Sequence, residues 1–146
     1  KVMSEKKISY NRRFLNHSFG DEFLRPTKIY TRSVLKILSN FKIKSMAHIT
    51  GGGISENLKR SLPKSLGAEI QLKKLSLHKK NSIYNWLGYN CKINQKEMLS
   101  TFNCGIGMIL VAKEQDKDLI LDFCKTIRQP VCVLGKVIKK NKIEFI

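Results

Sequence analysis

Acidic residues are scarce in this chain of 146 residues, which has 11 aspartates and glutamates against 28 lysines and arginines and a formal net charge of +17. An excess of this size is typical of nucleic-acid-binding proteins, because clustered lysine and arginine neutralise phosphates and release counterions. Here the lysines are spread from Lys1 to Lys142 and outnumber arginine, whereas contacts to base edges favour arginine. We therefore expect lysines on solvated faces, with an anionic small-molecule substrate nearby. A basic nucleic-acid-binding module is the alternative.

Long hydrophobic runs are also missing. No apolar stretch approaches the roughly 20 residues that a membrane-spanning helix needs. The segment 1–13 is basic but lacks the apolar stretch and the cleavage site of a signal peptide. The hydrophobic fraction of 42% is nevertheless ordinary, so a folded core is expected. These features predict a soluble, cytoplasmic protein with a single domain over residues 1–146.

Cysteines are few and show no metal-binding pattern. They form no Cys-x-x-Cys pair and no zinc-like grouping with the histidines. A domain of this size with an ordinary apolar fraction does not need disulfides. We expect no metal site in this chain and four reduced thiols, at Cys91, Cys104, Cys124 and Cys132.

Apolar residues alternate between helical and strand-like spacing, which predicts an α/β (α+β) domain: a mixed β-sheet with helices packed on it. The polar segment 17–25 is predicted to be a loop. Thr27 and Asn94 are predicted to cap helices. The expected helices cover residues 27–38, 55–62, 83–87, 94–99 and 116–127. The expected strands cover residues 43–50, 68–72, 105–112, 131–138 and 143–146.

The first candidate site is His-Ile-Thr-Gly-Gly-Gly, from His48 to Gly53, between a predicted strand and a predicted helix. Consecutive glycines permit positive φ and close approach of a ligand, and the N–H groups at a helix N-terminus attract anions. Thr50 adds a hydroxyl group, and Asn57 lies on the following helix. The functional interpretation is a phosphate cradle. The alternative is a tight turn that simply requires glycine.

The second candidate site is Thr-Phe-Asn-Cys-Gly-Ile-Gly-Met, from Thr101 to Met108. Glycine inside a strand suggests close approach by a backbone or a ligand, and packing around a bulge is the alternative. Cys104 has no base assignable from the sequence, so we favour a packing role over a nucleophilic one. Histidine titrates near neutral pH, which makes His48 a candidate general acid or base; a structural histidine is the alternative.

In this order and spacing, the segments resemble one family, aminoimidazole ribonucleotide synthetase. Both candidate sites resemble its two longest motifs, the first continuing into Glu56-Asn57-Leu58. Shorter matches extend the resemblance over nearly the whole chain: Leu24 to Tyr30, Gly67 to Ile70, Glu97-Met98 and Gly135 to Val137. The resemblance implies the fold of the family's C-terminal domain.

The resemblance also implies a reaction, the ATP-dependent ring closure of de novo purine biosynthesis. ATP phosphorylates the formyl-amide oxygen of formylglycinamidine ribonucleotide, and the neighbouring nitrogen then displaces phosphate, which leaves aminoimidazole ribonucleotide, ADP and phosphate. His48 would orient or protonate the leaving oxygen. The phosphate would be bound by Thr50, Gly51, Gly52 and Gly53, and the substrate would accept or donate hydrogen bonds at Asn57 and Asn103.

Family members are roughly twice this length, an ordinary two-domain size. The resemblance therefore implies that residues 1–146 are the C-terminal domain, that the N-terminal ATP-binding domain is absent from this chain, and that the chain alone is inactive. ATP and Mg²⁺ would be bound mostly by that other domain, which also supplies the contacts of a homodimer. Ser100 stands where the family usually has arginine. A vestigial, non-catalytic domain is therefore a second alternative.

Overall fold

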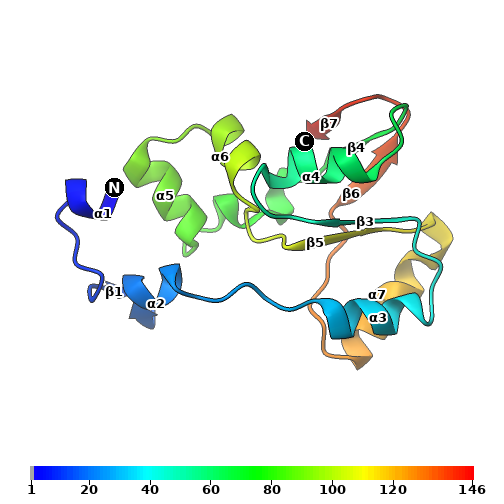
Figure 1. The fold of residues 1–146 in the computed structure, drawn as a ribbon, viewed down its shortest axis with the longest axis horizontal. Coiled ribbons are helices and arrows are strands. Elements are labelled where there is room, and N and C mark those ends of the chain that lie inside the picture. Colours follow the sequence, from blue (N-terminus) through cyan, green and yellow to red (C-terminus); the bar gives the residue numbers. More distant parts are fainter. Residues whose placement is uncertain (1) are drawn as a thin grey trace.

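Two paired strands run through the middle of the computed structural model, which describes residues 2–146 (Figure 1). Strand β3 (Ser45–His48) is antiparallel to β5 (Met108–Val111), with Ala47 opposite Ile109. The alternation of side chains buries Ala47 and places Ile109 against the main core. The strand predicted over 43–50 is therefore confirmed. The one predicted over 105–112 begins only at Met108, because Gly105 has a φ of +88° and turns the chain first.

A second sheet has three strands in the order β6 (Gly135–Ile138), β4 (Gly67–Ile70) and β7 (Ile143–Phe145). Strand β4 is antiparallel to β6 and parallel to β7, so the sheet is mixed. The predicted α/β class is confirmed, although the strands divide into three small sheets rather than one. The strand predicted to start at residue 131 is wrong by four residues, since β6 finds its partner only from Gly135 onward.

Helices α4 (Gly53–Ser61), α5 (Ile83–Cys91) and α6 (Gln95–Thr101) enclose the main core together with two short 3₁₀ turns, Leu72–Lys74 and Ser76–His78. The cap predicted at Asn94 is confirmed, because its side-chain oxygen accepts from the Glu97 N–H at 2.9 Å. The side chains with almost no exposed surface in this core include Ile49, Ile54, Leu58, Leu75 and Met98.

Helices α3 (Thr31–Leu38) and α7 (Lys117–Thr126) lie together at one end of the molecule, and a 3₁₀ turn, Glu114–Asp116, precedes α7 (Figure 1). They bury Ile37, Ile120 and Cys124 between them. Helix α7 is where the sequence predicts it. The cap predicted at Thr27 is wrong: residues 25–30 form no helix or strand, and the first helical hydrogen bond joins the Val34 N–H to the Tyr30 carbonyl at 2.9 Å.

The N-terminal segment folds into α1 (Val2–Glu5), β1 (Arg13–Phe14), β2 (His17–Ser18) and α2 (Phe19–Phe23). The loop predicted over residues 17–25 is therefore wrong. Ser18 and Asp21 form a capping box, which starts α2 and, through the Ser18 hydrogen bonds, lowers the pKa of the Asp21 carboxyl. None of the helices within residues 2–146 combines the length and the apolar character needed to cross a membrane.

Phe19 joins this N-terminal segment to α5. Its ring is 3% exposed and lies 4.7 Å, centroid to centroid, from Trp86. We expect Phe19→Ala to lower the free energy of unfolding by about 3 kcal/mol, because it removes a buried aromatic ring. Urea unfolding followed by the fluorescence of Trp86, the only tryptophan, would measure this. Phe23→Ala, at a ring 40% exposed, should cost clearly less; an equal cost would contradict the anchoring role of Phe19.

Candidate functional site

The pairing of β3 with β5 brings the two candidate motifs together. His48, the last residue of β3, lies opposite Met108, the first residue of β5. One residue further, the Ile49 N–H donates to the Gly107 carbonyl at 2.9 Å. The glycine loop (residues 51–53) therefore leaves the ribbon at the same end where the segment 103–107 enters it. Two segments about 55 residues apart in sequence thus meet at one end of the ribbon.

The glycine loop requires glycine at two of its three positions. Gly52 and Gly53 have φ values of +87° and +62°, which side chains rarely adopt. A side chain on Gly53 would also collide with the Leu99 carbonyl of α6, and one on Gly52 with the Glu56 carboxylate. Gly51 has open space around it, and Thr50 and Gly51 are exposed. The tight-turn interpretation thus explains Gly52 and Gly53, and leaves the exposed edge of the loop available to a ligand.

Asn57 is buried beneath this loop, one turn into α4. Its Nδ2 donates to the Gly51 carbonyl at 3.0 Å and to the Gly53 carbonyl at 2.7 Å. Its Oδ1 accepts from the guanidinium of Arg60. Every polar atom of the side chain is therefore engaged within α4 and its loop. The direct contact with substrate that the sequence suggests for Asn57 stays a prediction, and this geometry directs the amide to the loop.

A shallow depression with a volume of about 400 Å³ lies beside the loop. It is lined by Gly52, Ser55, Glu56, Lys59, Arg60 and Ser100. Ser100 of α6 donates to the Glu97 carbonyl at 3.1 Å. The lining thus includes two cationic side chains and one carboxylate, all from α4. Lys59 Nζ donates to the Leu66 carbonyl at 2.7 Å.

His48 is exposed and has an aromatic neighbour. The Tyr30 ring meets the His48 ring edge to face at 6.0 Å between centroids. The same tyrosine lies over Gly107, where a side chain would collide with its hydroxyl end. Lys28 Nζ is 5.9 Å from the centroid of the Tyr30 ring. Sequence reasoning missed Tyr30 as a site residue; its place in the segment that resembles the family, Leu24 to Tyr30, was the available signal.

Asn103 is held at the other side of the ribbon end. Its Oδ1 accepts from the Tyr84 hydroxyl at 2.6 Å and from the Gly105 N–H at 3.0 Å. Burial raises the pKa of the Tyr84 hydroxyl, which keeps it a hydrogen-bond donor. Tyr84 and Trp86 both lie on α5, where their rings contact Phe102 and Phe19 respectively.

Cys104 is a buried thiol. Its sulfur lies 3.6 Å from the Met98 and Phe102 carbonyls, and burial raises its pKa to about 11. A thiol that stays protonated at neutral pH is a poor nucleophile, which agrees with the packing role expected for it. Cys124 is buried as well, and burial raises its pKa. No disulfide joins the four cysteines, all of which the structure describes. The described side chains of residues 2–77 and 79–146 contain no group of three or more His, Cys, Asp or Glu that could hold a metal ion.

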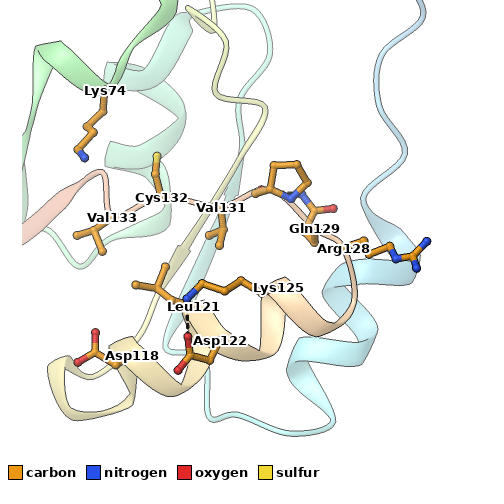
Figure 2. A pocket seen from close by; sticks show the side chains of 11 residues that line it. Lys74, Asp118, Leu121, Asp122, Lys125, Arg128, Gln129, Val131, Cys132 and Val133 are labelled. Carbon is orange, nitrogen blue, oxygen red and sulfur yellow. Dashed lines mark hydrogen bonds and ion pairs between the residues drawn. The ribbon is translucent and has the colours of Figure 1, made fainter.

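A larger depression, with a volume of about 880 Å³, lies beside α7 and contains none of the residues predicted from the sequence. Figure 2 shows α7 on one side and the extended segment 129–133 on the other. Its lining mixes apolar side chains with both signs of charge, and Lys125 pairs with Asp122 at 2.7 Å. The predicted site residues all lie at the ribbon end instead.

The thiols should differ in reactivity. At pH 8 we expect iodoacetamide to modify the exposed Cys132 before Cys104, whose raised pKa of about 11 leaves roughly one thiolate in a thousand. Mass spectrometry of peptides from timed aliquots would give the order. In urea the two rates should converge, because the pKa shift comes from burial; Cys104 reacting as fast as Cys132 in the folded protein would contradict the buried thiol.

Comparison with known proteins agrees with this geometry. A family model described as "AIR synthase related protein, C-terminal domain" matches residues 2–146. The phosphoribosylformylglycinamidine cyclo-ligase of Bacillus cytotoxicus is 34% identical to this chain, in a match that covers 99% of this chain and 41% of the relative. The enzyme of the same name from Nitrosococcus oceani is also 34% identical, in a match that covers 97% of this chain and 38% of the relative.

A trifunctional purine biosynthetic protein of Chironomus tentans is 41% identical over 83% of this chain and 8% of its own length. The chain thus spans about two fifths of the length of the cyclo-ligases it matches. The model match covers both candidate motifs and every strand of the two larger sheets. The chain therefore belongs to the AIR synthase related family and represents its C-terminal domain.

Proposed function

We propose that this chain is the C-terminal domain of an ATP-dependent cyclo-ligase that converts formylglycinamidine ribonucleotide into aminoimidazole ribonucleotide, ADP and phosphate in purine biosynthesis. The observation that carries the proposal is the meeting of the His48–Gly53 and Asn103–Gly107 segments at the end of the β3–β5 ribbon. The family match over residues 2–146 and the names of the relatives support it.

The reaction proceeds in two steps. ATP transfers its terminal phosphoryl group to the formyl-amide oxygen of the substrate, and ADP leaves. The neighbouring nitrogen then attacks the activated carbon; a carbon–nitrogen bond forms, the carbon–oxygen bond breaks, and phosphate departs. Such chemistry depends mainly on positioning and on neutralising the charge of the phosphoryl group.

The residues at the ribbon end suit the substrate side of this reaction. Thr50 and the N–H groups of Gly51 and Gly52 bind a phosphate at the N-terminus of α4. Gly53 shapes the loop, since its own N–H donates to the Thr50 carbonyl at 3.2 Å. Arg60 adds positive potential beside it. His48 orients or protonates the leaving oxygen, and the amide nitrogen of Asn103, whose oxygen is already engaged, donates to the substrate.

ATP and Mg²⁺ bind mostly outside this domain in the proposal. Among the side chains of residues 2–77 and 79–146, no group of three or more His, Cys, Asp or Glu residues is placed to hold a metal ion. The curated relatives are more than twice as long as the part that this chain matches. We assign the nucleotide, its magnesium and the homodimer contacts to an N-terminal domain, and we expect residues 1–146 alone to be inactive.

The first test uses the protein encoded by the complete reading frame, with its intact mass recorded. We expect ADP release from ATP that requires both Mg²⁺ and formylglycinamidine ribonucleotide, with one aminoimidazole ribonucleotide formed per ADP. Residues 1–146 supplied without the rest should release none. If the full-length protein does not catalyse the reaction, the proposed function is wrong and the alternative of a vestigial domain remains. Binding of a nucleic acid by that protein would then favour the basic nucleic-acid-binding module.

Substitutions at Gly52 test the phosphate cradle. Asparagine and aspartate have the same shape and both tolerate the left-handed φ of +87° better than other side chains, so Gly52→Asn serves as the matched control for Gly52→Asp. Both variants also carry Glu56→Ala, because the Glu56 carboxylate lies where a side chain on Gly52 would be placed and would itself repel the aspartate. We expect the aspartate variant to bind the ribonucleotide about tenfold more weakly than the asparagine variant, because its carboxylate repels the phosphate. Titration calorimetry would measure both dissociation constants. Equal values would contradict the hypothesis that the glycine loop binds the phosphate.

A further inference from the structure

Asn57 is the one buried polar side chain in the part of the chain that the structure describes, with 7% of its surface exposed. Buried polar groups need hydrogen-bond partners. The partners of this amide are the Gly51 and Gly53 carbonyls, at 3.0 and 2.7 Å, and the Arg60 guanidinium. Arg60 donates to Oδ1, so the amide is oriented with Nδ2 toward the loop.

These contacts determine which way two peptide groups point. No peptide bond in residues 2–146 is cis, and in a trans peptide the N–H points opposite to the carbonyl. Because the Gly51 and Gly53 carbonyls point at Asn57, the N–H groups of Gly52 and Ile54 point away from it, toward the N-terminal end of α4. Neither N–H has a backbone acceptor within the described residues.

A loop of three glycines has more backbone freedom than any other sequence of its length. Its conformation must therefore be imposed by neighbours. The Leu99 carbonyl lies against Gly53 and leaves no room for a side chain there. The Asn57 side chain donates hydrogen bonds to two of the loop's peptide carbonyls at once. The Asn57 side chain is buried, whereas Thr50 and Gly51 are exposed.

We propose that Asn57 and Arg60 are positioning residues: together they orient the peptide groups of the glycine loop so that the Gly52 and Ile54 N–H groups are aligned to bind the substrate phosphate. The inference rests on the proposed function for the identity of the ligand. It assigns Asn57 to the loop in place of a direct contact with the substrate, and it adds Arg60, which acts through Asn57.

Asn57→Asp tests this inference with little change in shape. A carboxylate keeps the contact with Arg60 but replaces two donors with an acceptor that repels the Gly51 and Gly53 carbonyls. The chain offers a matched control on α5: Asn90 also donates to the carbonyl four residues before it, that of Trp86, at 2.9 Å. Asn90→Asp makes the same chemical change away from the loop.

The first measurement is hydrogen–deuterium exchange in the full-length protein, read on peptides that cover residues 49–56. We expect Asn57→Asp to speed exchange there by about tenfold, the loss of roughly one hydrogen bond, and Asn90→Asp to leave it unchanged. Arg60→Met, on the exposed face of α4, should also speed exchange in residues 49–56, to a smaller extent. If Asn57→Asp does not fold, this variant tests the inference in its place. Unchanged exchange in the loop would overturn the inference.

The second measurement separates positioning from general stability. In steady-state kinetics of the same proteins, Asn57→Asp should raise KM for the ribonucleotide about tenfold while KM for ATP stays within about twofold. A parallel rise in both constants would mean a merely structural role and would overturn the inference. The two proposals can fail separately. If the parent protein neither binds nor cyclises the ribonucleotide, the proposed function is contradicted. Faster loop exchange in Asn57→Asp would then still support the positioning of the loop by Asn57.

Discussion

The antiparallel pairing of β3 with β5 is the contact on which the rest of the site depends. Four residue pairs and the additional bond from Ile49 to Gly107 determine which parts of two distant segments become neighbours. A shift of one residue in this register would move Ala47 out of the core and turn His48 inward. The position of the glycine loop relative to Asn103 thus follows from the burial of one strand face.

Local signals in the sequence were sufficient for much of the fold. The periodicity of α7, the Asn94 cap of α6 and the apolar runs of β3 and β4 all predicted their elements. The start of α3 differs from the prediction, because its N-cap position is Tyr30, which has no side-chain cap hydrogen bond and whose ring lies against Gly107, a residue 77 positions away. The α2 helix was missed although its Ser18–Asp21 capping pair is local, because a polar, glycine-containing segment was assigned to a loop.

The candidate site could be predicted in its residue types but not in their directions. The glycine run and Asn103 were visible in the sequence. The direction of the Asn57 amide, by contrast, depends on its position on α4 and on the hydrogen bond from Arg60, one turn later. Likewise, Tyr84 has no local pattern that connects it with Asn103; only the packing of α5 beside α6 brings its hydroxyl within 2.6 Å. Such nonlocal contacts are decided by packing of the core and not by spacing along the chain.

The positive charge in the depression beside the loop comes from a single helix. The cations there, Lys59 and Arg60, belong to α4, the helix that also begins with the glycine loop. Donor groups and counter-charge are therefore part of one rigid element. Because they lie on the same element, their spacing is set by the geometry of α4 and does not depend on how α4 packs against α6, so a bound anion would contact one helix instead of two.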